Sequence, residues 1–579
     1  VYLAMSAKDC AEVKSEDSSP VRKSANILHY RRPPEGYLAP EERSNATIVF
    51  GGLNWRHDFL AKAVFEAAGY RCETLPPPDE EVYELGRRFC SAGQCNPVYF
   101  TAGSLLKFLR GLLREGLDRD EICRRYVFFI ARSCGPCRFG MYEADYRLAL
   151  EAAGFADFRV LPFALNAGIH QDEEKGLRYG IDFGLGVYKA VLLADIFRDL
   201  HFQIRPYEVV PGQTDEVFHR CLNRIYAHLR QSGADREGDS KTPVSVSPKP
   251  ARGGRWWNCF KAIHRHLHGS DFVQVLDECR RDIDSITVDR FRVKPVVKLT
   301  GELFAHLTEG PGNYDMFSFL EQEGAQVFPD PIGSMLTHLL YQRRNEGRHR
   351  SAMLCGVAPT LKQDLRLRLA HWRKAMPLWF AEKAYVHHYD LFRRRLGGTA
   401  HRLPAQADLA RLAAPFYHPV LRGGEAHLEV GKSIYYTLLR ECHLVLSLKP
   451  FGCMPSAQSD GVQVAVQERY PELLFLSLET SGDGLVLAQS RVQMALAEAR
   501  RAARDEVEAA LRRTGRSLDE LQRFVESRPE YRRALYPVPR ERDFVTPAAR
   551  FILHVSRRMN GDTRGSNVAG SSEEPSERG

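Results

Sequence analysis

Short apolar runs alternate with amphipathic segments along the first part of the chain. Thr47–Phe50 is an apolar run of strand length, and apolar residues then recur with helical spacing as far as Gly69. The segment YRCETLPPP predicts a second strand. The same order returns in a strand at Tyr126–Ile130, a helix at Tyr142–Ala153 and a strand at Phe158–Phe163. Both predicted helices end in EAAG. We therefore predict two β-α-β units with parallel strands.

The same alternation appears in the second half of the chain, on either side of a long helical region. Residues 333 to 440 are rich in Arg and Leu and predict mainly helices. The flanking elements are strands at Val296–Leu299, Gln326–Phe328, Leu444–Leu448 and Leu473–Leu478, and helices at Tyr314–Glu323, Gln458–Glu468 and Leu487–Arg513. The last of these helices is long and amphipathic.

These patterns predict an α/β protein of two Rossmann-like lobes, each with a parallel sheet flanked by helices. We expect a disordered N-terminal segment at 1–44, a first lobe at 45–230, a flexible Ser- and Pro-rich linker at 231–255, and a second lobe with a helical insertion at 256–514. Residues 515–579 are expected to form a helical extension and a disordered tail.

Composition narrows the class of protein. The chain has 579 residues, is 44% hydrophobic and carries a formal net charge of +8, which is small for its length. No nucleic-acid-binding motif is visible, so we expect no nucleic-acid partner.

The most apolar helical stretch, GVYKAVLLADIF, is interrupted by Lys189 and Asp195, so no membrane span is expected. The start VYLAMSAKDC lacks the features of a secretory signal, and thirteen cysteines then indicate reduced thiols in a cytoplasmic protein.

Four of these cysteines lie just beyond the end of an apolar strand pattern. Cys95 precedes a helix, Cys134 and Cys137 occur in RSCGPCRFG after a strand, and Cys453 occurs in KPFGCMPS after another strand. Open α/β sheets gather ligands at the carboxyl ends of their strands, so these thiols can meet. Thiolates are soft donors suited to iron or zinc. We predict a metal site of all four cysteines in the cleft between the lobes, best matched by a 4Fe–4S cluster.

Two other interpretations of these cysteines stay open. Zinc also accepts four sulfur ligands, although structural zinc cysteines usually come as two close pairs. CGPC between a strand and a helix is also the arrangement of a thiol-disulfide oxidoreductase, although Arg132 and Ser133 precede it here in place of an aromatic residue. Cys90 and Cys355, the latter expected in a loop, are alternative ligands.

The remaining cysteines within predicted helices or strands are expected to be small apolar core residues. They are Cys72, Cys123, Cys221, Cys279 and Cys442.

Two polar loops follow predicted strands, one in each half of the chain. Asn54–His57 follows the first strand, and Glu479–Asp483 follows the last. His57 and Glu479 are weak catalytic candidates, and the catalytic residues are otherwise unknown. Asn54 is better explained as a helix cap, and residues 481–483 as a turn. No phosphate-binding loop of known spacing occurs, so we do not expect this chain to hydrolyse ATP.

At these residues the chain resembles the 2-hydroxyacyl-CoA dehydratase and activase-related group, in particular the CoA-substrate-specific enzyme activase-related (2-hydroxyglutaryl-CoA dehydratase activator-related) proteins. The matching phrases run from about residue 46 to 500. They are FGGLNWRHD, GQCNPVYFTAGSLLKFL, ARSCGPCRFGMY, FQIRPYEVVPGQTD, VDRFRVKPVVKLTGE, RLAAPFYHP and the Cys453 loop through LFLSLETSGDG.

The resemblance implies paired Rossmann-like lobes around an iron-sulfur cluster. It also implies a separate ATPase activase of the actin and sugar-kinase superfold, which delivers low-potential electrons to this chain. A CoA-ester substrate or a second dehydratase subunit is a further implied partner. Arg132 and Arg138 flank the CGPC pair and can tune the potential of a bound cluster.

Overall fold

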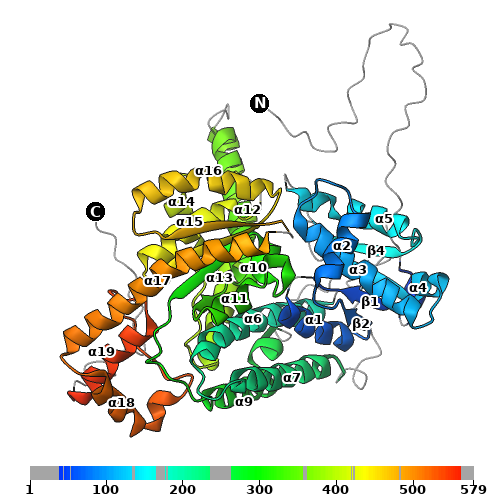
Figure 1. Ribbon diagram of the computed structural model, residues 1–579. Helices are drawn as coiled ribbons and strands as arrows, with labels where there is room; N and C mark the ends of the chain where they lie inside the picture. The colour runs from blue at the N-terminus through cyan, green and yellow to red at the C-terminus, as the bar shows by residue number, and fades with distance from the viewer. Residues whose placement is uncertain are drawn as a thin grey trace, which may run out of the picture. The chain divides into compact units, whose positions relative to one another are not determined.

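Two parallel β-sheets of four strands each organise the protein. The computed structural model describes residues 38–43, 45–52, 54–132, 137–164, 177, 180–234, 263–355, 361–418, 420–421, 424–481 and 484–561. The strand orders are β2-β1-β3-β4 in the first sheet and β6-β5-β7-β8 in the second. The two sheets therefore repeat one topology, and helices account for most of the remaining described residues (Figure 1).

The first sheet is built from the N-terminal part of the chain. Its strands are β1 (Thr47–Phe50), β2 (Arg71–Thr74), β3 (Tyr126–Arg132) and β4 (Arg159–Ala164). The accompanying helices are η2 (Pro40–Glu42), α1 (Trp55–Ala67), α2 (Glu80–Phe89), α3 (Asn96–Arg114), α4 (Arg119–Arg125), η3 (Arg138–Met141) and α5 (Tyr142–Ala152). Val49 and Phe128 pack against α3 and α5, while Ile48 and Val127 pack with Phe65 of α1. Alternate strand residues thus bury both faces of the sheet.

The second sheet is built in the same way from the C-terminal half. Its strands are β5 (Val296–Gly301), β6 (Gln326–Phe328), β7 (Leu444–Pro450) and β8 (Phe475–Thr480). The accompanying helices are α10 (Leu303–Leu307), η5 (Pro311–Asn313), α11 (Met316–Gln322), α12 (Ile332–Cys355), α13 (Leu361–Arg395), α14 (Gln406–Ala413), α15 (Ala426–Leu438), α16 (Met454–Arg469) and α17 (Leu485–Thr514). Leu446 of β7 packs with residues of α11 and α17, and its neighbour Val445 packs with residues of α15.

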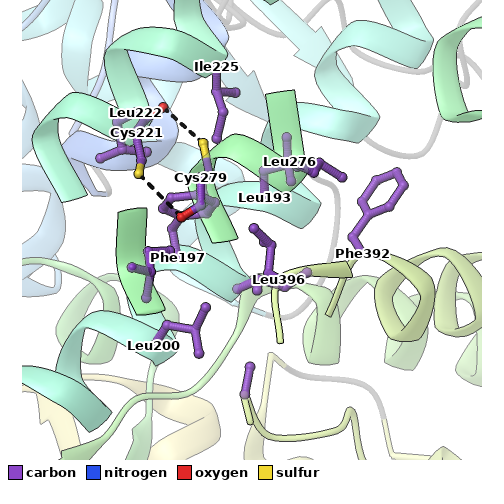
Figure 2. Packing of buried hydrophobic residues seen from close by; sticks show 14 of the residues in the cluster. Leu193, Phe197, Leu200, Cys221, Leu222, Ile225, Leu276, Cys279, Phe392 and Leu396 are labelled. Carbon is purple, nitrogen blue, oxygen red and sulfur yellow. Dashed lines mark hydrogen bonds between the residues drawn. The ribbon is translucent and has the colours of Figure 1, made fainter. Parts of the chain in front are cut away.

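A helical core accompanies the two sheets. It contains α6 (Ile181–Ile204), α7 (Gln213–Ala234), α9 (Ser270–Asp284) and the end of α13, which share one cluster of buried side chains (Figure 2). The remaining elements are η4 (Arg205–Tyr207), α18 (Leu518–Glu526), η6 (Pro529–Arg532) and α19 (Pro547–Met559). None of the helices in the described ranges combines the length and the apolarity that crossing a membrane requires.

Most predicted elements occur at the predicted places, and a few boundaries differ. α16 begins at Met454 and not near Gln458, because Pro455 is favourable in the first turn of a helix. α7 continues to Ala234, so the predicted linker at 231–255 begins with helical residues. Residues 1–37, residue 44 and residues 235–262 lie outside the described residues.

Three predictions about single residues also have clear outcomes. Gly69 and Gly154, which end the two EAAG segments, have φ angles of 84° and 83°, the left-handed conformation typical of a helix end. Cys355 is the last residue of α12, so its predicted position in a loop is wrong. Cys442 lies just before β7 and not inside an element, although it is buried as predicted.

The second sheet contains a buried group of charges. Lys298 of β5 and Lys432 of α15 contact opposite oxygens of Asp330, at 3.2 and 2.5 Å. All three side chains are at most 2% exposed. A single carboxylate therefore compensates two ammonium groups that have no access to bulk water.

The shared strand order fixes where a ligand site can form. In each sheet the first and third strands along the chain are neighbours, and the connections that follow them lead to opposite edges of the sheet. A crevice is therefore expected outside the carboxyl ends of these two strands. The segments at these points are the loops that follow β1, β3, β5 and β7. The last three lead into CGPC, Glu302 and Cys453.

Candidate metal centre

Each of the three described candidate ligands begins a helix. Cys95 is the N-cap of α3, Cys137 is the N-cap of η3, and Cys453 is the N-cap of α16. α3 and α16 are long helices, whose N-terminal amides favour negative charge. Cys134 lies in the stretch 133–136, outside the described residues. The prediction that these cysteines precede helices is therefore confirmed for three of the four. The prediction that Cys95 follows a strand is wrong, because α2 lies between β2 and Cys95.

The segments that carry these cysteines converge. A Cβ atom on Gly452 would lie 2.9 Å from Nη1 of Arg138 and 4.0 Å from the carbonyl oxygen of Gln94. These three residues are sequence neighbours of Cys453, Cys137 and Cys95. Arg138 also donates a hydrogen bond to the carbonyl oxygen of Gly93, which joins the CGPC segment to the turn before α3.

The three thiols interact electrostatically. Burial is the main cause that raises the pKa of Cys95 and of Cys453 to about 12, and the Cys137 thiol contributes to the rise at both. Cys137 therefore lies within electrostatic range of a thiol from the first sheet and of a thiol from the second. Without a cation, burial keeps these groups protonated, and a bound metal would favour their thiolate forms.

Glu302 is the acidic group common to the three cysteines. It caps α10, where its Oε2 accepts a hydrogen bond from the Ala305 amide at 3.1 Å. Burial raises the pKa of Glu302 to about 7. Its charge in turn raises the pKa of all three thiols. The centre therefore combines three thiols with a carboxyl group that ionises near neutral pH.

Other neighbours complete the surroundings of Cys95 and Cys137. The Tyr142 hydroxyl lies 2.8 Å from Sγ of Cys95, and the Cys137 sulfur accepts the Phe139 amide at 3.4 Å. Arg132, predicted to tune the centre, contacts Glu143 at 3.2 Å. Arg138 is placed closer to the cysteines and lowers the pKa of Cys95. Of the two arginines, Arg138 is therefore the better placed to tune a bound group.

A metal ion also requires ligands that lie close together. Among the residues that the structure describes, which leave out Cys134, no three or more His, Cys, Asp or Glu side chains are grouped closely enough to hold a metal ion. The described thiols thus share a region and an electrostatic environment. In the sequence, Cys134 precedes Cys137 by three residues.

The other described cysteines have different surroundings. Cys72 lies in β2 and is buried, and Cys123 lies in α4. Cys90 is the C-cap of α2, and burial is the main cause that raises its pKa to about 12. Cys221 and Cys279 pack in the helical core, as the sequence pattern predicts.

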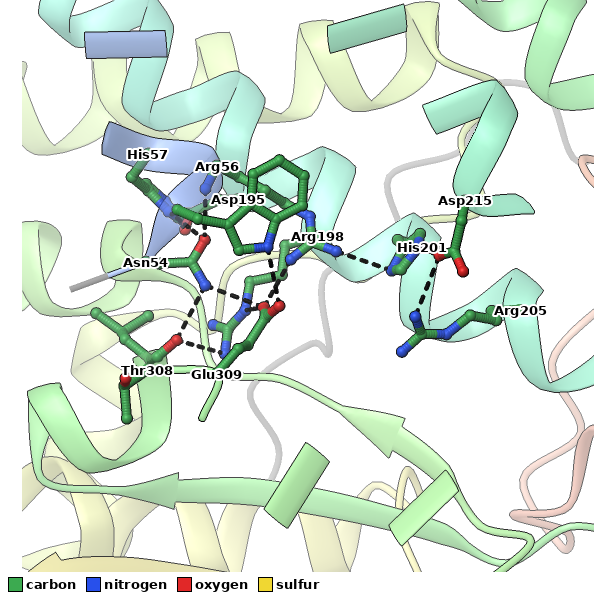
Figure 3. Close-up of polar contacts among 12 residues, drawn as sticks. Asn54, Arg56, His57, Asp195, Arg198, His201, Arg205, Asp215, Thr308 and Glu309 are labelled. Atoms are coloured by element: carbon green, nitrogen blue, oxygen red, sulfur yellow. Dashed lines mark hydrogen bonds and ion pairs between the residues drawn. The ribbon is translucent and has the colours of Figure 1, made fainter. Parts of the chain in front are cut away.

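The loop after β1 forms a second polar region, made with residues of the other half of the chain (Figure 3). Asn54 caps α1 through its Oδ1, as predicted, and its Nδ2 donates to the carbonyl oxygen of Leu307 at 3.0 Å. Glu309 accepts hydrogen bonds from Asn54, from Trp55 and from Arg56, the last at 2.6 Å. This network connects the edge of the first sheet with the segment that follows β5 and α10.

α6 supplies the other half of the same network. Arg198 is 1% exposed, contacts Glu309 at 3.4 Å and donates to the carbonyl oxygen of His306 at 2.8 Å. His201 lies between Arg56 and Asp215, at 3.0 and 2.6 Å. Burial, reinforced by Arg56, lowers the pKa of His201 to about 4, so its ring is neutral at neutral pH.

The two weak catalytic candidates lie in different environments. His57 is buried, with Nε2 3.1 Å from Asp195 and Nδ1 3.3 Å from Oδ1 of Asn54. These contacts place His57 in the polar network. Glu479 lies in β8 and is exposed. Beyond it, Ser481 contacts Tyr83 and Tyr314 from different parts of the chain, and residues 482–483 lie outside the described residues.

Sequence reasoning placed none of three further residues at the metal centre. Glu302 follows β5 much as the cysteine loops follow β3 and β7, and that position was the only available signal. Tyr142 follows the CGPC loop closely, but its contact with Cys95 depends on tertiary structure. Glu425, whose charge raises the pKa of Cys137, has no comparable signal.

Comparisons with known proteins add no family assignment, because no protein-family model and no curated protein matches the chain.

Proposed function

We propose that this chain is an iron-sulfur electron-transfer protein that holds a 4Fe–4S cluster through Cys95, Cys134, Cys137 and Cys453. The observation that carries the proposal is that the segments carrying three of these cysteines, from both halves of the chain, contact one another beyond the ends of β3 and β7. The donor set fits the group, because thiolates are the usual ligands of such clusters. A cluster supplies one-electron redox chemistry when bound.

The geometry suits a group larger than a single ion. A four-iron cluster spreads its thiolates over different irons, so the sulfurs need to surround a common volume. The Cys137 thiol raises the pKa of both Cys95 and Cys453, and the charge of Glu302 raises the pKa of all three thiols. The N-termini of α3 and α16 can compensate the negative charge of bound thiolates, and Arg138 adds a nearby cation.

The proposal includes the finer fold and the family. We infer that each sheet with its helices is a Rossmann-like lobe, and that the protein belongs to the 2-hydroxyacyl-CoA dehydratase and activase-related group. The repeated strand order and the cysteine segments support this inference. In such a system the chain would receive low-potential electrons from a separate ATPase and pass them to a CoA-ester substrate or to a second subunit.

Metal and sulfide analysis tests the proposal most directly. The protein should be purified without oxygen and analysed for iron, acid-labile sulfide and zinc. Iron and sulfide in equal amounts support the proposal. Stoichiometric zinc without sulfide would show instead a zinc-stabilised scaffold. A metal-free protein whose CGPC pair reduces disulfides would show a thiol-disulfide oxidoreductase.

Single substitutions test the ligand set. Cys95→Ser, Cys134→Ser, Cys137→Ser and Cys453→Ser should each lose iron and visible absorption. Cys72→Ser is the matched control, because Cys72 is also buried but lies within β2, where it donates to the carbonyl oxygen of Lys62. A normal cluster in Cys453→Ser would contradict a site shared by both sheets and would make Cys90 the next candidate.

The dependence on an ATPase has its own test. The chain lacks the glycine-rich spacings that hold nucleotide phosphates, so it should neither bind nor hydrolyse ATP. Its cluster should be reduced faster when the ATPase, a reductant and ATP are all present. Tight binding of ATP by this chain alone, measured by calorimetry, would refute the division of labour.

A further inference from the structure

Cys221 of α7 and Cys279 of α9 face each other in the helical core (Figure 2). The sulfur of each lies 3.8 Å from the carbonyl oxygen of the other. Both residues are 0% exposed. This reciprocal arrangement holds two thiols side by side between packed helices.

One polar side chain reaches this pair. Nη1 of Arg224 lies 4.0 Å from Sγ of Cys279 and 2.8 Å from Oδ2 of Asp282. The Arg224 side chain is 30% exposed. The Cys279 sulfur is therefore in contact with a side chain that itself reaches the solvent.

The two thiols are not equivalent. A hydrogen bond from Cys221, together with the Arg224 guanidinium, holds the pKa of Cys279 below its ordinary value. The hydrogen bond with Cys279, followed by burial, raises the pKa of Cys221. A nearby cation favours the thiolate, and the Arg224 guanidinium contacts the Cys279 sulfur, so we assign Cys279 as the attacking group and Cys221 as the resolving group.

We propose that Cys221 and Cys279 form a redox-active dithiol that closes to an intramolecular disulfide when a hydroperoxide oxidises it. The inference is independent of the proposed function, because it uses neither the candidate metal centre nor a bound cofactor.

The chemistry balances with hydrogen peroxide as the oxidant. The Cys279 thiolate attacks one peroxide oxygen, the O–O bond breaks, and a sulfenic acid and hydroxide form. The hydroxide takes up the proton that Cys279 released. Cys221 then attacks the sulfenic sulfur, its proton leaves with the displaced hydroxyl as water, and the S–S bond forms. Two thiols and one peroxide thus give one disulfide and two water molecules.

The disulfide would connect two helices that are joined in sequence by a long intervening segment. It would close a loop over residues 222–278, which contains the stretch predicted to be a flexible linker. Closing a loop of this kind restricts the unfolded chain. The oxidised protein should therefore resist unfolding and proteolysis better than the reduced protein.

Peptide mapping tests the proposal on the purified full-length chain. Hydrogen peroxide is added to the reduced protein, the reaction is stopped by denaturation with an alkylating agent, and the protein is digested with trypsin without reduction. Peptides 221–224 and 266–280 should accumulate as one disulfide-linked species that dithiothreitol separates. Cys442 is the internal control, because burial raises its pKa to about 12, and it should remain a free thiol.

Two variants make the result specific. Cys442→Ser should form the same linked peptides at the wild-type rate. Arg224→Gln should form them several-fold more slowly, as peptide 221–230 linked to 266–280, because the Cys279 thiolate loses its cation. If both thiols stay reduced in the folded wild type, or if oxidised Cys279 is found only as sulfinic or sulfonic acid, the proposal is wrong.

Discussion

Replacing Gly103 with alanine should separate α2 from α3, whereas the same change at Gly111 should not. A Cβ atom at Gly103 would lie 1.9 Å from the carbonyl oxygen of Val82, and real Cβ contacts essentially never fall below 3.0 Å. The two helices would have to move apart by about 1 Å, because the obstacle is backbone. Gly111 lies in the same helix and has nothing within 4 Å of its Cβ position.

The magnitudes follow from two opposing effects. Alanine favours a helix over glycine by about 1 kcal/mol, and this gain applies at both positions. Overpacking a close contact costs about 1–3 kcal/mol, and more when backbone obstructs the new atom. Gly111→Ala should therefore raise the free energy of unfolding by about 0.5–1 kcal/mol, and Gly103→Ala should lower it by about 2 kcal/mol or more.

The comparison also has a consequence for function, because α3 begins directly after Cys95. A displaced α3 moves that thiol away from Cys137. On the proposed function, Gly103→Ala should therefore bind less iron than the wild type, and Gly111→Ala should bind the same amount. Urea unfolding and iron analysis measure the two effects on the same preparations. If Gly103→Ala is as stable as Gly111→Ala, the close packing of α2 and α3 is wrong.

Three further predictions concern carboxyl groups, of which Asp330 is buried and Glu309 and Glu302 are half-buried. Glu309→Gln should lower the free energy of unfolding by about 3 kcal/mol at pH 7, because Arg56 and Arg198 outweigh the effect of burial and lower the pKa of Glu309 from 4.5 to about 2. Urea unfolding should show this difference above pH 4.5, and the difference should disappear as the pH falls toward 2. Asp330→Asn should lower the free energy of unfolding by about 3–5 kcal/mol or prevent folding, because two buried lysines lose their counter-ion. Thermal unfolding followed by circular dichroism measures the change in stability. Glu302→Gln should become more stable than the wild type as the pH rises from 4.5 through 7, because burial raises the pKa of Glu302 and makes its ionised form unfavourable; melting temperatures across that range check the sign. A difference of the opposite sign in any of the three would contradict the assigned environment.

The sequence was most informative where structure depends on local pattern. The strand at Gln326–Phe328 occurs with the predicted bounds, because a short apolar run between a helix-ending glycine and Pro329 leaves few alternatives. α16 begins earlier than predicted, because its first turn, Met454–Ala457, contains Pro455 and shows no apolar period. Cys355 was placed in a loop for a similar reason, since the end of α12 carries no apolar stripe.

The candidate site was predictable only in part. The positions of Cys95, Cys137 and Cys453 before helices followed from the alternation of strands and helices. A general property of parallel sheets predicts that the segments of Cys137 and Cys453 lie close together, and the structure shows contacts between them. It does not explain the place of Cys95, which lies between two helices. The contact of Tyr142 with Cys95 and the network around Glu309 were not predictable, because they join residues that no periodic pattern connects.

The contacts of α6 restrict the motions available to the molecule. Asp195 accepts hydrogen bonds from the first amides of α12, Arg198 contacts Glu309, and Asp199 contacts His401 at 2.8 Å. A shift of α6 along its axis by one helical turn, about 5.4 Å, would break all of these contacts at once. It would also leave buried charges without partners. Any motion that keeps these contacts must therefore leave α6 in place relative to α12, Glu309 and His401, and bend the chain at other elements.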